Sequence, residues 1–149
     1  MNVNTIIEKE EIPVQELVRS ALEARKKAYA PYSGYMVGAA VLTNELRIYT
    51  GCNIENASYS PSICAERTAV SKAVSEGKRK FKAIAVAGGR GGEEITRYAY
   101  PCGVCRQVLR EFAGQDELVV IVARSIRDYK AHLLGELLPE SFGPENLNN

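Results

Sequence analysis

The chain has 149 residues, of which 46% are apolar and 25% are charged, and this composition is that of one ordinary globular domain. Its length suffices to bury a core without disulfide bonds. The formal net charge of +1 argues against a surface for nucleic acid or membrane. We therefore expect a single domain over residues 1–149, with neither nucleic acid nor membrane as a partner.

The N-terminal segment lacks the pattern of a secretory signal. Charged residues between Glu8 and Glu11 occupy the place of the apolar stretch that such a signal needs. No apolar run approaches the length of a transmembrane helix. We expect a soluble, cytoplasmic protein, in which the four cysteines are thiols or metal ligands and not disulfides.

The predicted elements begin with a helix over residues 14–29, where apolar side chains recur at helical spacing and Pro31 ends the helix. Two strands over residues 35–43 and 46–52 follow and form a hairpin. Its turn at Asn44 lacks the usual glycine, so the sequence leaves the turn geometry open.

Helices and strands alternate in the rest of the chain. They are a helix over 64–76 ended by Gly77, a buried strand over 81–87, a glycine-rich loop over 88–92, a helix over 102–113, a buried strand over 118–123, an edge strand over 129–133, and a helical turn at 135–138 before a loose tail after Gly143. The two buried strands, joined through a helix, should be parallel. This order predicts a three-layer α/β/α sandwich around a mixed five-stranded sheet.

Two short motifs carry chemistry, and each lies at the start of a predicted helix. The first contains Cys64 and Glu66, and the second contains Cys102 and Cys105. Helix N-termini stabilise thiolates, the form of cysteine that binds zinc. Three cysteine ligands leave the fourth position of a tetrahedral zinc ion to water, as in catalytic sites. Glu66 is then placed to take a proton from that water.

The residues alone leave several alternatives open. Cys52 could complete a structural four-cysteine site, or the Cys102-x-x-Cys105 pair could act alone in thiol redox chemistry. Either Arg67 or Arg106 could donate to the thiolates and offset their negative charge. The only histidine, His132, is expected to be an ordinary surface or edge residue.

The motifs match the signature of the zinc nucleobase deaminases in its three-cysteine form. Within that superfamily the chain resembles the small cytidine deaminases, from about Val14 to Leu147. Five stretches carry the resemblance: residues 32–40, 51–56, 63–69, 101–107 and 136–139. The resemblance implies a cytidine deaminase-like fold and a homotetramer with one Zn²⁺ per subunit and active sites at subunit interfaces.

The resemblance also implies roles for single residues. Asn53 and Glu55 correspond to the pair that hydrogen-bonds the 3′-hydroxyl of the ribose, and both are expected to point the same way from an extended strand. The backbone N–H of Ala65 would bind the O2 atom of the base. Arg67 corresponds to the arginine that donates to the thiolates, and Phe142 to an aromatic residue that reaches the pyrimidine of a neighbouring subunit.

The implied reaction is hydrolysis of cytidine and deoxycytidine to uridine and deoxyuridine with release of ammonia, a step of pyrimidine salvage. Zinc-bound hydroxide would attack C4, and Glu66 would carry the proton to N3 and then to the amine. A related deaminase of an aminoacyl-nucleoside or of cytosine in nucleic acid is the alternative. Tyr35, in the pocket lining, and Tyr100 depart from the usual phenylalanine and serine, and the loop over 88–92 has no assigned role.

Overall fold

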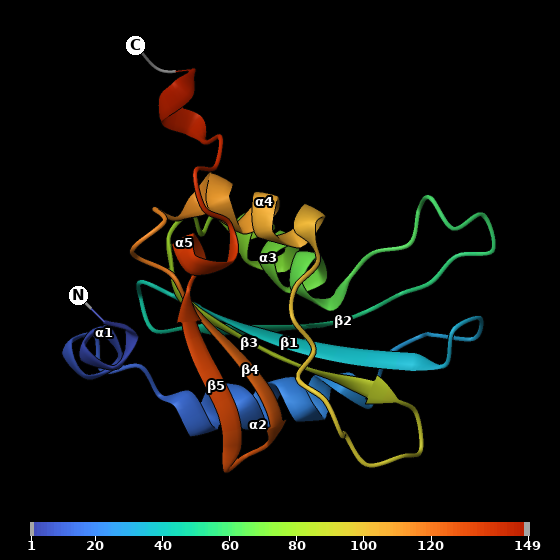
Figure 1. The fold of residues 1–149 in the computed structure, drawn as a ribbon. Coiled ribbons are helices and arrows are strands. Elements are labelled where there is room, and N and C mark those ends of the chain that lie inside the picture. The colour runs from blue at the N-terminus through green and yellow to red at the C-terminus, as the bar shows by residue number, and fades with distance from the viewer. Residues whose placement is uncertain (1, 148–149) are drawn as a thin grey trace.

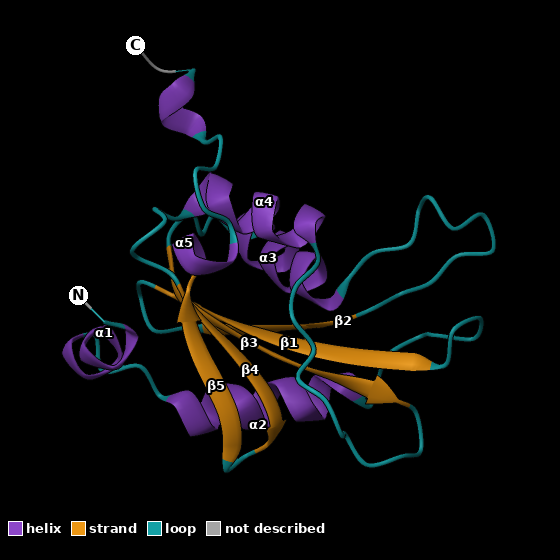
Figure 2. Ribbon diagram, in the orientation of Figure 1, coloured by secondary structure: helices purple, strands orange, loops and turns teal. Residues whose placement is uncertain are grey.

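The computed structural model describes residues 2–147 and consists of one mixed sheet between two layers of helices (Figures 1 and 2). The strands lie in the order β2-β1-β3-β4-β5. In chain order the elements are α1 (Val3–Lys9), α2 (Val14–Arg25), β1 (Tyr35–Thr43), β2 (Ile48–Cys52), α3 (Ala65–Ser75), β3 (Phe81–Arg90), α4 (Gly103–Phe112), β4 (Val119–Ser125), β5 (Asp128–Leu133), α5 (Leu134–Leu137) and the 3₁₀ helix η1 (Pro144–Asn146).

Each face of the sheet is buried under its own helices. Along β4, Val119 and Ile121 pack in the core beneath α1 and α2, whereas Val120 and Val122 pack beneath α3, α4 and α5. Because side chains alternate across a strand, a strand with both faces covered needs an unbroken apolar run. The three-layer α/β/α sandwich around five strands is therefore confirmed.

Only one neighbouring pair of strands is parallel in the described part of the sheet. β3 and β4 run parallel, with Ala83 opposite Val119 and Val86 opposite Val122, while the other three pairs are antiparallel. The predicted parallel pairing of the two buried strands is thus confirmed. The crossover between them contains α4, and so the sheet fixes where this helix begins and ends.

The first long helix is shorter than its pattern indicates. It ends at Arg25 and not at residue 29, and the backbone N–H groups of Lys27 and Ala28 bond to carbonyls three residues back. The Arg25 guanidinium donates to the carbonyls of Met36, Gly89 and Arg90 at 2.8–2.9 Å. Beyond this point the backbone of Tyr29 pairs with the chain that follows β2. These partners are distant in the sequence, so helical periodicity could not reveal where the helix ends.

The prediction of a glycine-rich loop over residues 88–92 was wrong for residues 88–90. β3 continues to Arg90, and Gly88 pairs with Val37 in the neighbouring strand. A Cβ atom on Gly88 would lie 2.9 Å from a methyl group of Val37 and 3.1 Å from the side chain of Ala99. This glycine therefore allows close approach inside the sheet and does not mark a loop.

Two short helices at the chain ends were not predicted. Asn2 caps α1, since its side-chain oxygen accepts a hydrogen bond from the backbone N–H of Thr5 at 2.9 Å. The tail after Gly143, expected to be loose, forms η1. In the β1–β2 hairpin, Leu46 takes a left-handed backbone conformation (φ 68°) in place of the usual glycine. Within residues 2–147, no helix has the length and apolar character needed to cross a bilayer.

Gly51 in β2 provides a test of how tightly α3 is seated on the sheet. In a Gly51→Ala variant the new Cβ would lie 2.4 Å from the backbone N of Ala69 and 2.6 Å from the carbonyl oxygen of Ala65. Since the clash is with helix backbone, we expect the free energy of unfolding to fall by about 3 kcal/mol in denaturant titrations. Gly89→Ala is the control, because its Cβ would meet nothing closer than 3.4 Å. Equal stability of the two variants would contradict this packing.

Candidate metal and substrate site

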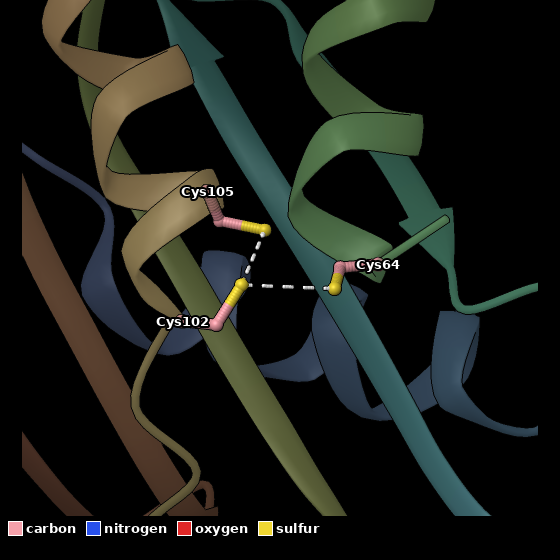
Figure 3. A group of neighbouring side chains, drawn as sticks. All are labelled: Cys64, Cys102 and Cys105. Atoms are coloured by element: carbon pink, nitrogen blue, oxygen red, sulfur yellow. Dashed lines mark hydrogen bonds between the residues drawn. The ribbon is translucent and has the colours of Figure 1, made fainter. Parts of the chain in front are cut away.

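Three cysteine sulfurs meet between the starts of α3 and α4 (Figure 3). Cys64 precedes α3, while Cys102 precedes α4 and Cys105 lies in its first turn. The Sγ atoms of Cys64 and Cys102 are 4.0 Å apart, those of Cys102 and Cys105 are 3.6 Å apart, and all three lie within 4.8 Å of one another. The structure therefore brings together the three predicted metal ligands.

Local backbone conformation explains why the sulfurs face one another. Cys64 and Cys102 are both N-cap residues with extended backbone, and neither side chain caps its own helix. The first N–H groups of both helices remain without intrahelical partners and carry partial positive charge. Two such ends side by side stabilise negative charge on the sulfurs between them.

The sulfur spacing suits a tetrahedral zinc ion. With Zn–S bonds of 2.3 Å, tetrahedral geometry requires sulfur–sulfur distances of about 3.8 Å, close to those observed. The cysteines are free and not oxidised to disulfides. The guanidinium of Arg67 donates to Cys64 Sγ at 3.5 Å, while its buried Nε atom has no partner among the described residues. Donor type, spacing and the neighbouring positive charge all fit a thiolate-bound metal.

Hydrogen bonds among the sulfurs determine which thiol ionises first without metal. A hydrogen bond from Cys105, together with the Arg67 guanidinium, lowers the pKa of Cys64 to about 5. The same bond raises the pKa of Cys105, because its proton is held between the two sulfurs. The bond to Cys64 also raises the pKa of Arg67, so this side chain stays charged. Arg67 and the neighbouring thiols thus favour the thiolate form of Cys64.

Glu66 lies in the first turn of α3, beside the cluster. Its side chain is only 4% exposed, and burial raises its pKa to about 7. A carboxyl group with this pKa takes up and releases protons readily at neutral pH. Burial of an acidic residue also costs free energy, which ordinary helix packing does not require. This position therefore indicates a chemical role for Glu66.

Two of the three cysteines, Cys64 and Cys102, line a cavity of about 520 Å³. Its walls come from both helix starts, the central sheet and two loops. The lining residues are Ser33, Tyr35, Val37, Asn53, Glu55, Ser62, Ile63, Cys64, Ala65, Glu66, Arg67, Val86, Tyr98, Ala99, Tyr100 and Cys102. The cavity thus brings Cys64, Cys102 and Glu66 together with the polar residues after β2 that the sequence singled out.

Asn53 and Glu55 both belong to the lining of this cavity, and both are bonded to the backbone of the chain over residues 32–37. Asn53 accepts a hydrogen bond from the Val37 N–H and donates to the Tyr35 carbonyl, both at 2.8 Å. Glu55 accepts from the backbone N–H groups of Tyr32 and Ser33 at 3.0 and 3.1 Å. The Ser33 hydroxyl and these N–H groups lower the pKa of Glu55, so the carboxylate is ionised.

Of the other residues singled out in the sequence, Ala65 and Tyr35 line the cavity and Phe142 does not. Ala65 begins α3, so its backbone N–H lacks an intrahelical partner, and Tyr35 belongs to the cavity lining. Phe142 lies outside the cavity of its own chain and is 57% exposed. Its carbonyl accepts a hydrogen bond from Gln107 on α4, and the buried Arg110 one turn further holds Ser141.

Two alternative roles are contradicted by the geometry. Cys52 is outside the sulfur cluster, and its thiol donates to the Lys27 carbonyl at 3.5 Å, so it does not close a four-cysteine site. Arg106 donates to the carbonyls of Pro101 and Leu137, whereas Arg67 contacts a sulfur. Of the two candidate arginines, Arg67 is therefore the one with a hydrogen bond to a cysteine sulfur among the described residues.

Some lining residues were missed in the sequence. Val86 and Ser33 have no distinctive pattern, because one belongs to an apolar strand and the other to a polar loop. Tyr98 precedes the second cysteine motif by a few residues, and this proximity was the one available signal. Its hydroxyl pairs with Asp128 on β5, a partner that no local pattern reveals.

A larger hollow of about 680 Å³ lies between the start of β3, the end of α4 and η1. It contains no cysteine, and two of its charged pairs, Lys82 with Glu10 and Arg110 with Glu145, already neutralise each other. Its chemistry is that of a salt-bridged surface. Size alone therefore does not identify the functional site, which is the smaller cavity.

Comparisons with known proteins agree with this geometry. Residues 12–122 match the family model of the cytidine and deoxycytidylate deaminase zinc-binding region. A cytidine deaminase of Sporosarcina psychrophila is 44% identical over 135 residues, covering 91% of this chain and 95% of the relative. The cytidine deaminase of Mycobacterium tuberculosis is 41% identical over 128 residues, covering 86% and 88%.

A solved structure leads to the same result. The crystal structure of cytidine deaminase from Burkholderia pseudomallei superposes with a TM-score of 0.74 at 45% identity, covering 85% of this chain and 97% of that one. The family model spans most of the chain and includes all three cysteines and Glu66. The chain therefore belongs to the cytidine and deoxycytidylate deaminase family.

Proposed function

We propose that this protein is a zinc-dependent hydrolase that converts cytidine and deoxycytidine to uridine and deoxyuridine with release of ammonia. The observation that carries the proposal is the position of a buried carboxyl group, Glu66, beside three converging sulfurs, in a cavity that two of the cysteines line. A polar pair, Asn53 and Glu55, lines the same cavity. The cavity thus combines a metal-binding end with a wall suited to a sugar.

Cys64, Cys102 and Cys105 would hold one zinc ion in each subunit. When bound, zinc supplies Lewis acidity that allows water to act as a nucleophile at neutral pH. Three thiolates would leave the centre negatively charged, and the permanently charged Arg67 guanidinium beside Cys64 reduces that charge. The role proposed for Arg67 is therefore electrostatic.

Glu66 would carry protons between water and the base. Its carboxylate takes a proton from the attacking water as the new C4–O bond forms, and delivers it to N3 of the ring. It then transfers the second proton to the amine as the C4–N bond breaks, so cytidine and water become uridine and ammonia. A pKa near neutrality suits a group that must both accept and release a proton.

Asn53 and Glu55 would bind the 3′-hydroxyl of the sugar. The Glu55 carboxylate has acceptor capacity beyond its bonds to the backbone, and the Asn53 amide has a second N–H. The N–H of Ala65 would donate to O2 of the base, and Tyr35 would line the pocket. These contacts would favour a nucleoside over the free base.

The proposed assembly is a cytoplasmic homotetramer with active sites at subunit interfaces. Phe142 supports it, because an exposed aromatic side chain fixed through its backbone to α4 is available to a neighbouring subunit. It would then contact the pyrimidine bound by that subunit. Residues 1–149 would form one domain in each copy, and the isolated subunit would be poorly active.

The metal assignment is tested by replacing one ligand. We expect Cys102→Ala to lose its zinc on dialysis, and its free energy of unfolding to fall by about 4 kcal/mol in buffer where zinc exceeds its Kd 1,000-fold. Metal analysis and denaturant titration measure both effects. Cys52→Ala is the matched control and should keep its zinc, because Cys52 lies outside the cluster. Full zinc occupancy in Cys102→Ala would remove that residue from the ligand set.

The role of Glu66 is tested by replacing its side-chain carboxylate with the corresponding amide. Glu66→Gln should retain zinc but lose roughly 10²- to 10⁴-fold in kcat for cytidine, because the amide cannot transfer protons. The loss of cytidine absorbance measures turnover. Glu76→Gln, beyond the other end of α3, should turn over cytidine normally. Comparable kcat values for Glu66→Gln and the unmodified protein would show that the proton follows another route.

Substrate class is tested with cytidine, cytosine and a cytosine-containing oligonucleotide. The unmodified protein should prefer cytidine. Glu55→Gln should reduce kcat/KM for cytidine by about 10- to 100-fold, since a charge-assisted hydrogen bond is weakened, and should leave cytosine unaffected. An equal loss for both compounds would mean that Glu55 holds the loop and does not bind the sugar. Faster turnover of the oligonucleotide would assign the enzyme to the nucleic-acid deaminases.

A further inference from the structure

Residues 96–100, called the strap here, lie between β3 and α4 and are fastened to the β4–β5 side of the sheet. The segment from β3 to α4, yellow to orange in Figure 1, runs back over the sheet toward the start of α4. Arg124 donates to the Thr96 carbonyl at 3.2 Å, and the Tyr98 hydroxyl donates to Asp128. The strap therefore has side-chain attachments in place of strand pairing.

The strap forms part of the wall of the site cavity. Tyr98, Ala99 and Tyr100 all belong to the lining, and the chain then passes through Pro101 to Cys102. The position of the strap thus affects both the shape of the cavity and the approach to a metal ligand. A change in its attachments should alter how a substrate fits.

The last attachment of the strap joins Tyr100 to the only histidine of the chain. The Tyr100 hydroxyl lies 3.2 Å from Nε2 of His132 on β5, and the two ring centroids are 5.5 Å apart. The other ring nitrogen of His132 lies 3.5 Å from the carboxylate of Glu136 in α5. The His132 ring therefore lies between the Glu136 carboxylate and the Tyr100 hydroxyl.

Between Tyr100 and the candidate metal ligand Cys102, the chain is also attached at Pro101. The carbonyl of Pro101 accepts a hydrogen bond from Nε of Arg106 at 2.7 Å, and Arg106 also holds the Leu137 carbonyl. Pro101 has a fixed φ angle, which limits how far movement passes along the backbone. Releasing Tyr100 should therefore move the cavity wall while Cys102 stays in place.

We propose that Tyr100 is a positioning residue for substrate binding, and that its hydrogen bond to His132 holds the strap as the cavity wall at the metal-binding end. This role rests on the proposed function, because it assumes that the cavity binds the nucleoside. It assigns to His132 a task at the site that its place in an edge strand did not indicate. It also predicts an effect on KM without loss of metal.

The test is a double-mutant cycle in the zinc-loaded protein. Tyr100→Phe and His132→Ala should each raise KM for cytidine about fivefold, the value of one hydrogen bond, while kcat and zinc content stay near those of the unmodified protein. The double variant should also show about a fivefold rise, because both changes remove the same bond. Tyr129→Phe is the control on the same strand, since the Tyr129 hydroxyl has no hydrogen bond among the described residues, and its KM should not change.

The outcomes separate this role from the proposed function. Unchanged KM in Tyr100→Phe, or losses that multiply in the double variant, would overturn the role of the Tyr100–His132 bond while leaving the deaminase assignment intact. Loss of zinc in Tyr100→Phe would show that the bond supports the metal ligand and not the wall. An unmodified, zinc-loaded protein unable to deaminate cytidine would overturn the proposed function and this role with it.

Discussion

The site depends on the side-by-side placement of two helix starts. Neither α3 nor α4 could concentrate three sulfurs alone, because one helix supplies one cysteine and the other supplies two. The sheet sets this placement by fixing the segments that lead into both helices. At Gly51 the strand comes so close to α3 that no side chain fits between them. Backbone packing thus governs the chemistry, and the electrostatics of the helix ends follow from it.

The chemical centre was largely predictable from the sequence, whereas its surroundings were less so. Cys64, Glu66, Cys102 and Cys105 lie at helix starts marked by local signals, so their convergence followed from an α/β topology. The sugar-binding roles expected of Asn53 and Glu55 rested on the family resemblance, because two polar residues after a strand have no distinctive chemistry. The parallel pair followed from the alternation of elements, whereas the full order of the strands emerged only from the structure.

The features that escaped prediction depend on partners far away in the chain. Arg25, the last residue of its helix, donates to carbonyls of two strands, and Gly88 pairs with Val37 inside the sheet. The attachment of Tyr100 to His132 joins residues 32 positions apart. Periodicity and turn composition report only on nearby residues, so contacts of this kind emerge only when the fold is assembled.

Helix α4 contributes both to the sulfur cluster and to the position of the segment over residues 141–142. Its first turn supplies two sulfurs, while Gln107 and Arg110 further along fasten the segment that carries Phe142. The orientation of a single short helix therefore sets both the position of the sulfurs and that of the exposed Phe142 side chain. Evolutionary change in the seating of this helix would have to satisfy both requirements at once, so drift in its sequence should be slow on two opposite faces.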